Sequence, residues 1–239
     1  MSFDVITNNI PYLWEGLKTT LKLAAISIGL SFVLGTLLGM AKLSKRALIR
    51  IPATLYVEIV RGTPLIMVIF WVFFLIPILV GHSIQPFTSA VAAFTIFTSA
   101  YIAEIVRAGI NSIPVGQTEA ALASGLTYWQ AMRYIILPQA ITRMIPPLVG
   151  QFISLFKDTS LAYIIGVLEL TRRATIINNR EFKSFEIFTF TALIYFVLCY
   201  AMSRFAKYLE KRRRVGETKN EKIPEPEIMA GDIGAQTTP

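Results

Sequence analysis

The sequence contains little charge for its length. Asp, Glu, Lys and Arg make up 16% of its 239 residues, whereas about 25% is usual in a soluble globular protein. Hydrophobic residues make up 54%, and the mean hydropathy is +0.57. The deficit of charge indicates a surface that contacts lipid and argues against an ordinary soluble domain.

Several chemistries lack the residues that they need. The single cysteine, Cys199, lies in an apolar run and cannot form an internal disulfide, and no Cys/His spacing suggests a metal site. The dipeptide Gly-Lys does not occur, so the chain has no P-loop and should not hydrolyse ATP. The one histidine, His82, lies in a predicted turn, so no Ser/His/Asp set can form. We therefore expect no catalytic residues and no metal site, and a membrane-embedded enzyme has no support.

Five apolar stretches are long enough to cross a bilayer, for which a helix needs about 20 residues. No charged residue occurs from Gly62 to Ala103, and a single helix of that length would be about twice as long as the hydrocarbon is thick. Residues 81–86 are typical of a turn and divide this run into two spans. The predicted spans are residues 17–41, 53–80, 87–106, 144–168 and 187–203. The sequence therefore predicts an all-α polytopic membrane protein with about five transmembrane helices.

Glycine and proline add detail to two of these spans. Gly35 and Gly39 lie four residues apart in the first span, a spacing that favours close helix–helix packing. Pro146 and Pro147 are placed at the start of the fourth span, where the proline ring is tolerated.

Basic residues predict the topology, because Lys and Arg are enriched in short cytoplasmic segments beside spans. The net charge is +8, and 15 of the 23 basic residues lie in residues 42–50, 107–143 and 204–222. All three segments face the cytoplasm if the N-terminus is outside, so we predict an N-out, C-in arrangement and no binding of nucleic acid. The loop at 169–186 is an exception on the predicted outer face. Its basic residues are Arg172, Arg173, Arg180 and Lys183.

The chain divides into two parts. Residues 1–210 are predicted to form a transmembrane domain with a cytoplasmic loop at 115–140. Residues 211–239 begin with the basic run 211–214 and continue as a polar segment without periodicity. We expect this segment to be a disordered cytoplasmic tail.

The loop between the third and fourth spans is too polar to cross a membrane and too long for a simple turn. Glu119, Ala120 and Ala121 favour a short helix. Gly125 favours a helix end or tight corner, and Pro138 is expected to break the second helix. The loop is therefore predicted to hold a helix, a turn and a second helix on the cytoplasmic surface.

This loop resembles the EAA motif of binding-protein-dependent ABC importer permeases. The identities at the motif's offsets are Glu119, Ala120, Ala121, Gly125, Ile135, Leu137 and Pro138. Residues 58–65, 101–110 and 155–161 resemble the polar amino-acid branch of that family, the histidine, glutamine and glutamate permeases. The resemblance covers about residues 10–210. It implies a type I ABC importer permease fold with a coupling helix that docks on a separate ATPase.

The resemblance also implies partners. ATP and Mg would be bound by two copies of an ABC ATPase subunit, and this chain would hold no cofactor. Five helices are few to enclose a path for an amino acid, so a second permease subunit, identical or paralogous, is expected. A periplasmic or lipid-anchored amino-acid-binding protein would deliver the substrate to the bacterial inner membrane.

An ATP-independent secondary transporter or channel is the alternative function. It would not require a docking loop, and such proteins usually contain internal repeats, which we do not find between the two halves.

Ionisable residues at membrane depth indicate the substrate path, because each costs roughly 2.5–3.5 kcal/mol on insertion scales. Lys157 and Asp158 are adjacent, so they point about 100° apart on a helix and cannot simply pair with each other. We hypothesise that Asp158 faces the path and holds the ammonium or a cationic side chain of the substrate. Thr159 and Ser160 would add hydroxyl groups.

Two further pairs have the spacing of neighbours on one helix face. Glu58 and Arg61 form one pair, and Glu104 and Arg107 form the other. They are interpreted either as local ion pairs near the cytoplasmic interface or as elements of a gate. Lys157 and Asp158 could instead be structural, with partners among Glu58, Arg61 and Glu104.

Overall fold

The computed structural model describes residues 4–217, with side chains described to residue 208, and this part of the chain is helical without strands. The elements in chain order are α1 (Asp4–Lys42), α2 (Ala47–Arg61), α3 (Leu65–Phe70), the π-helical turn η1 (Trp71–Leu75), α4 (Ile76–Val80), α5 (Pro86–Asn111), α6 (Val115–Ala123), α7 (Tyr128–Ala131), the π-helical turn η2 (Met132–Ile136), α8 (Leu137–Asp158), the 3₁₀ segment η3 (Thr159–Ile165), α9 (Leu170–Glu181) and α10 (Ser184–Glu217).

The number of membrane spans agrees with the prediction. Four continuous helical segments are long and apolar enough to cross a membrane, at 4–42, 86–111, 128–165 and 184–208. A fifth crossing is formed if the bent pair 47–61 and 65–80 counts as one span. The all-α polytopic fold is therefore confirmed.

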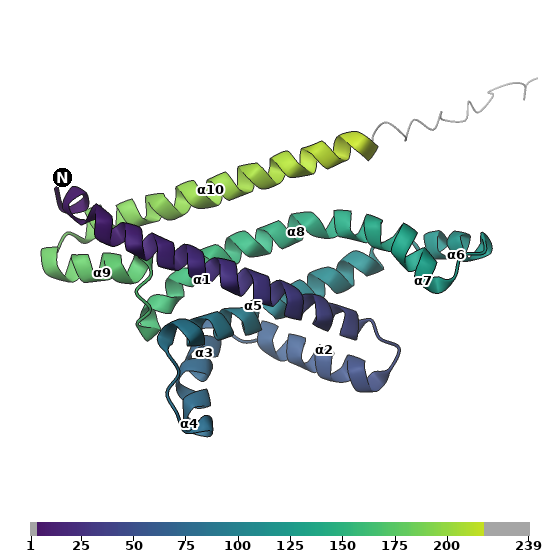
Figure 1. Ribbon diagram of the computed structural model, residues 1–239, viewed down its shortest axis with the longest axis horizontal. Helices are drawn as coiled ribbons and strands as arrows, with labels where there is room; N and C mark the ends of the chain where they lie inside the picture. The colour runs from purple at the N-terminus through teal and green to yellow at the C-terminus, as the bar shows by residue number, and fades with distance from the viewer. Residues whose placement is uncertain (1–3, 218–239) are drawn as a thin grey trace, which may run out of the picture.

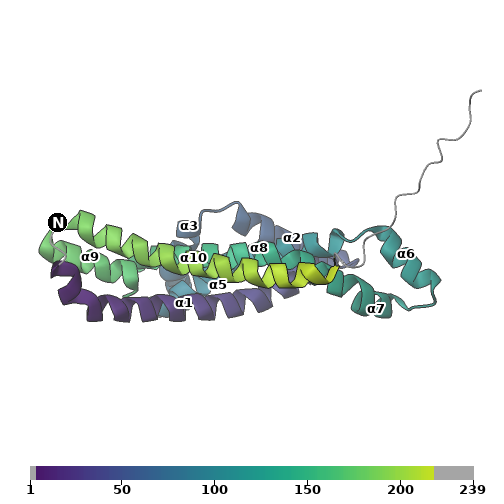
Figure 2. The ribbon, with the colours of Figure 1, turned by 90° about the horizontal axis from the view of Figure 1, so that it is seen from above.

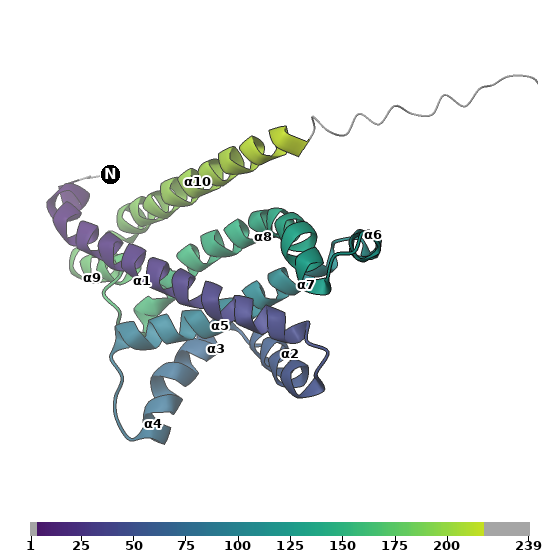
Figure 3. The same ribbon diagram turned by 45° about the vertical axis from the view of Figure 1, so that its right-hand side comes forward.

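The second predicted span, 53–80, is wrong as a single helix. The chain bends by 108° between α2 and α3, and Figure 3 shows the two halves diverging. Pro64 has an extended backbone, with ψ of 138°. Proline lacks an N–H and disfavours helical conformation in the residue before it, so the helix ends at Arg61 and restarts at Leu65.

In the fourth span, by contrast, the prolines interrupt the helix less than predicted. Pro138 does not break the helix, and Pro146 and Pro147 lie inside α8 instead of opening a span. The wider π-helical turn η2 precedes Pro138, and the Gln139 side chain donates a hydrogen bond to the carbonyl of Ile135. These contacts occupy backbone groups near the proline ring, so the helix continues from residue 128 to residue 158. Lys157 and Asp158 therefore lie at its end and not at its centre.

The first residues of the predicted C-terminal tail are helical. Helix α10 continues to Glu217, so the basic run 211–214 is helical. The rest of the predicted disordered tail, residues 218–239, lies outside the described residues.

The long helices run side by side and separate two ends of the molecule (Figures 1 and 2). The N-terminus and α9 lie at one end, whereas α6, α7 and the last turns of α10 lie at the other. The EAA loop and the basic end of α10 therefore share one end, and loop 169–186 lies with the N-terminus. This arrangement agrees with the predicted N-out, C-in topology.

Helices α1 and α5 are in close contact because glycine removes the side chains between them. A Cβ atom at Gly35 would lie 2.6 Å from Cβ of Ile102, and one at Gly39 would lie 2.7 Å from the carbonyl oxygen of Ala103. The helix–helix contact predicted for these glycines is confirmed.

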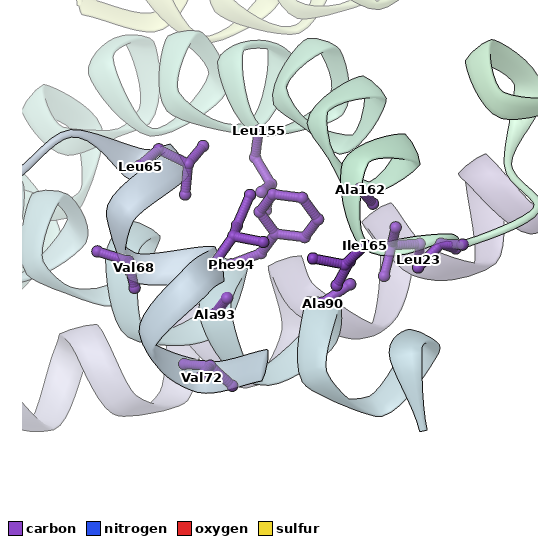
Figure 4. Packing of buried hydrophobic residues seen from close by; sticks show 12 residues of the cluster. Leu23, Leu65, Val68, Val72, Ala90, Ala93, Phe94, Leu155, Ala162 and Ile165 are labelled. Carbon is purple, nitrogen blue, oxygen red and sulfur yellow. The ribbon is translucent and has the colours of Figure 1, made fainter. Parts of the chain in front are cut away.

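A hydrophobic cluster holds the broken helix in place. Phe94 of α5 is fully buried among Leu65 and Val68 of α3 and Leu155 of α8. Figure 4 shows the Phe94 ring between these elements, with Ile165 of η3 on its far side. The cluster fixes the ends of α8 and α3 against α5, and so positions the segment that contains Asp158.

A buried carboxyl group fixes the start of α9. Glu169 is fully buried, and its carboxylate accepts hydrogen bonds from the backbone N–H groups of Thr171 (2.8 Å) and Arg172 (2.6 Å). The hydroxyl of Tyr195 in α10 donates a further bond of 3.1 Å. Burial raises the pKa of Glu169 from 4.5 to about 7, against the opposing effect of these hydrogen bonds.

Glu169 should make the stability of the protein depend on pH. Because its pKa is higher in the folded state, its contribution to stability is fully present below pH 4.5 and is lost as the pH rises toward about 7. Each pKa unit corresponds to ~1.4 kcal/mol. In detergent, the melting temperature of Glu169→Gln should fall less between pH 5 and pH 8 than that of the unmodified protein. Equal slopes in the two proteins would contradict this assignment, and Glu181→Gln, an exposed carboxyl at the other end of α9, is the control.

Candidate functional site

The EAA loop folds as a helical hairpin that extends beyond the bundle. Helix α6 ends in a hydrogen-bonded turn, in which Gly125 N–H donates to Leu122 O and Leu126 N–H donates to Ala121 O. Gly125 has φ of +84°, a left-handed conformation that favours glycine. Thr127 then caps α7 through reciprocal hydrogen bonds with Gln130. The predicted helix, turn and helix are confirmed, although the second helix continues into the membrane-spanning α8.

The hairpin exposes both the motif and a set of apolar side chains. Glu119, Ala120, Gly125 and Pro138 are exposed, and Leu137 is half-buried, whereas Ala121 is buried under the hairpin. The exposed apolar residues are Val115, Leu122, Tyr128, Trp129 and Tyr134. An exposed apolar patch marks an interaction surface. The sequence pattern found the motif but did not identify the aromatic residues as part of this surface.

A cluster of charges joins three helices at the same end of the bundle. Lys42, at the end of α1, lies with its Nζ 2.8 Å from Oε2 of Glu104 in α5 and 3.6 Å from Oε1 of Glu58 in α2. Glu104 also pairs with Arg107 one turn further along α5. The Lys42 side chain is only 6% exposed, so it depends on these carboxylates to remain charged.

The two predicted local pairs have different outcomes. The ion pair between Glu104 and Arg107 is confirmed. The one between Glu58 and Arg61 is wrong, since no ion pair joins them within residues 4–208: Glu58 approaches Lys42, and the Arg61 guanidinium lies 5.5 Å from the centre of the Tyr101 ring. Helix α2 ends at Arg61, and packing against α1 and α5 determines these contacts instead of the i, i+3 spacing.

A cavity of about 590 Å³ lies next to the charge cluster, between α2, α5 and α8, and its surface is mostly apolar with a few charged and polar groups. Arg61, Glu104 and Arg143 supply its charged lining, and Gln151 supplies an amide. Arg143 also donates a hydrogen bond to the carbonyl of Ser112, which ties α8 to the end of α5. In the described part of the chain, neither Arg61 nor Arg143 forms an ion pair with a carboxylate.

The residues predicted for the substrate path do not form one surface. Lys157 is exposed, and Asp158 and Ser160 are half-buried at the junction of α8 and η3. Thr159 is fully buried, and its hydroxyl donates to the carbonyl of Phe156 at 2.6 Å. Among residues 4–208, neither Lys157 nor Asp158 has an ion-pair partner, so the alternative of pairing with Glu58, Arg61 or Glu104 is not realised. None of these four residues lines the cavity between α2, α5 and α8.

The sequence did not predict the roles of several residues near these sites. Lys42 and Arg143 were counted only as cytoplasmic charges, and Tyr101 and Gln151 were given no role. Gln151 could have been recognised as a cavity residue, because its polar side chain lies within an apolar run. The partners of Lys42 are distant in sequence, so only packing could identify them.

The charges of Lys42, Glu58, Glu104 and Arg107, here called the Lys42 cluster, should stabilise the fold. Replacing Lys42 by Met leaves Glu58 without its partner and removes one of the two partners of Glu104. We expect a loss of about 1–3 kcal/mol, below the range for a fully buried pair because Glu104 is partly exposed. The matched control is Lys45→Met, an exposed lysine three residues further on. Chemical or thermal unfolding in detergent measures the effect, and adding Glu104→Gln to Lys42→Met should restore part of it. Equal stability of the two single variants would contradict the role of the cluster.

Comparison with known proteins identifies the family. Residues 31–215 match the family described as binding-protein-dependent transport system inner membrane component. The chain is 43% identical over 208 residues to the probable glutamine ABC transporter permease protein GlnP of Bacillus subtilis, covering 86% of this chain and 95% of that protein. It is 39% identical over 214 residues to the glutamate/aspartate import permease protein GltK of Escherichia coli O6:H1, covering 87% and 96%.

Solved structures have the same fold. An amino acid ABC transporter crystallised with histidines superposes with a TM-score of 0.85 at 36% identity, covering 89% of this chain and 99% of that one. The MetNI methionine ABC transporter in an inward-facing conformation superposes with a TM-score of 0.73 at 21% identity, covering 86% and 97%, which shows a shared fold. The chain therefore belongs to the family of binding-protein-dependent transport system inner membrane components, the membrane-spanning permease subunits of ABC importers.

Proposed function

We propose that this chain carries a polar amino acid into the cell, as the permease subunit of an importer powered by a separate ATPase. The exposed hairpin 115–138 carries the proposal. It combines the EAA residues with exposed aromatic side chains at the end of the molecule opposite the N-terminus. The relatives with amino acids in their names support the substrate class. An ATP-independent transporter, the alternative, is not favoured by this family membership.

The partners follow from what the chain lacks. ATP and Mg would be bound by two copies of an ABC ATPase, because this sequence contains no P-loop. A second permease subunit, identical or paralogous, would complete the path. An amino-acid-binding protein, periplasmic or lipid-anchored, would deliver the substrate at the end that contains α9.

The hairpin can transmit movement because of where its ends lie. It follows the end of α5 and leads directly into α8, and Arg143 of α8 bonds to the carbonyl of Ser112 just after α5. A force applied to α6 by the ATPase would therefore move α5 and α8 together. These two helices and α2 line the cavity of about 590 Å³, and Lys42 of α1 contacts carboxylates of both α2 and α5. We propose that Glu58, Arg61, Glu104 and Arg107, with Lys42, act as a gate at this end of the path.

The substrate path is proposed to contain both polar sites. Asp158, half-buried and without an ion-pair partner among residues 4–208, would hold the ammonium or a cationic side chain, with Lys157 and Ser160 nearby. The cavity lined by Arg61 and Arg143 would suit the carboxylate of a substrate on its way to the cytoplasm. Thr159 would act by supporting the end of α8, since its hydroxyl is bonded to Phe156.

Coupling to the ATPase is tested at Gly125. Gly125→Val places a β-branched side chain at φ of +84° and should distort the turn of the hairpin. We expect the substrate-stimulated ATP hydrolysis of the reconstituted complex to fall about tenfold or more, from strain of roughly 1–2 kcal/mol at the docking surface. Gly29→Val, at an exposed glycine of α1 with open space around it and outside the hairpin, is the control. Uptake that continues without any ATPase would instead support the secondary transporter.

The role of Asp158 is tested by Asp158→Asn. Removing the charge should weaken substrate affinity about tenfold or more, since a hydrogen bond to a charged group contributes roughly 1.5–3 kcal/mol. Binding to the detergent-purified complex, measured over a panel of amino acids, gives both the loss and the preferred substrate. Glu181→Gln, which removes an exposed carboxylate outside the bundle, is the control. Unchanged affinity and transport rate would contradict the assignment of Asp158 to substrate binding and would leave the arginine-lined cavity as the path.

A further inference from the structure

The basic outer segment at 169–186 is not explained by topology or by transport. Basic residues are normally enriched on the cytoplasmic side, yet this segment lies at the same end as the N-terminus. The structure accounts for one of its arginines. Arg173 lies 4.5 Å from the centre of the Tyr12 ring and donates to the carbonyl oxygens of Leu168 and Tyr12. Arg180 is different, because it is exposed and has no ion-pair partner among residues 4–208.

The turn that follows Arg180 presents aromatic side chains outward. Phe182 ends α9 in a left-handed conformation, with φ of 53° and ψ of 35°. Its N–H donates to the carbonyl of Asn178, and the Ser184 hydroxyl donates to the Asn178 side chain, so the turn is held firmly. A bulky residue rarely adopts this conformation, yet the Phe182 side chain is 87% exposed and gains little from packing within the chain. Phe185, one turn later, is 65% exposed.

An apolar groove begins directly below this turn. It has a volume of about 370 Å³ and lies between the first turns of α1 and the outer side of α10. Its lining residues are Ile6, Phe185, Glu186, Thr189, Phe190, Ala192, Leu193 and Phe196. Only 11% of the membrane-spanning window of α10 is buried within this chain, so the groove is open on its outer side.

The length of the groove fits one leaflet. From Phe185 to Phe196 a helix rises about 16 Å at ~1.5 Å per residue. Half of the ~30 Å hydrocarbon thickness is about 15 Å. The lining residues 185–196 of α10 fall in the first half of the candidate span 184–208, so the length of the groove matches one leaflet and one acyl chain.

The charges next to the groove in the chain complement a phospholipid headgroup. Arg180 lies in the last turn of α9, and Glu186, in the first turn of α10, lines the groove. No ion pair joins Arg180 to Glu186 or to Glu181 in the part of the chain with described side chains. A guanidinium suits a phosphate, and a carboxylate suits a primary ammonium.

We propose that this groove is a phospholipid-binding site of the outer leaflet, in which one acyl chain lies along α10 and the phosphate binds Arg180. Glu186 favours a headgroup with a primary ammonium, as in phosphatidylethanolamine. Phe182 and Phe185 insert at the level of the headgroups and hold the turn at the membrane surface. The site anchors α9 and the start of α10 against the N-terminus of α1, and it does not depend on the transported substrate.

The site is tested by native mass spectrometry of the full-length chain in detergent, titrated with phosphatidylethanolamine. Ala192→Trp fills the groove, and Arg180→Gln removes the phosphate contact. Each should retain the lipid about tenfold less than the unmodified protein. Val197→Trp is the matched control, since Val197 is 55% exposed on the same helix and does not line the groove. Its lipid retention should be unchanged.

Three results would overturn the proposal. Equal lipid retention in all four proteins would show that the groove binds no specific lipid. Loss of dimers in the Ala192→Trp spectra, with unchanged lipid, would assign the groove to a second copy of the chain. Reduced capture of the binding protein by Arg180→Gln, again with unchanged lipid, would assign the basic turn to protein docking.

Discussion

The close contact between α1 and α5 sets the position of the charged groups at the coupling end of the bundle. Gly35 and Gly39 let the two backbones approach, with Gly39 against the carbonyl of Ala103. Lys42 follows Gly39 by less than one turn, so it reaches Glu104 on α5 without leaving the helix. The Lys42 side chain is almost fully buried, and a buried ammonium is stable only beside a carboxylate. The glycines therefore determine which charges can pair.

The prolines show how helix continuity depends on neighbouring hydrogen bonds. Pro64 follows Gly-Thr, and no wider turn compensates for its missing N–H, so the chain bends between α2 and α3. Pro138 follows the π-helical turn η2, and the helix continues through it and through Pro146 and Pro147. The same residue type therefore ends one membrane helix and is accommodated in another. The bend lets α3 pack its apolar side on Phe94, which fixes the end of α8.

The two ends of the molecule have different surfaces. At one end the hairpin exposes the EAA residues and large aromatic side chains, at the same end as the ion pairs of Lys42 and the arginine-lined cavity. At the other end the Glu169 carboxyl group caps α9 and bonds to α10, and the turn after α9 presents Arg180 and Phe182. The first surface suits a protein motor, and the second suits the headgroup region of a membrane. Long helices connect the two ends, and α8 runs from the hairpin to Asp158.

The sequence alone determined the class, the number of spans and the hairpin, because these depend on local properties. An absence of charge over about 20 residues predicts a span wherever the helix packs, and the Glu119–Gly125 pattern specifies a short helix with a glycine end through its own backbone. The pairing of Glu104 with Arg107 was likewise predictable, since both residues lie on one face of one helix. Tertiary structure decided the rest. Lys42 meets Glu104, Arg61 lies over Tyr101 and Arg143 joins the cavity, because helices distant in sequence pack together. Helix packing, and not sequence spacing, brings such charges within the few ångströms at which they interact strongly.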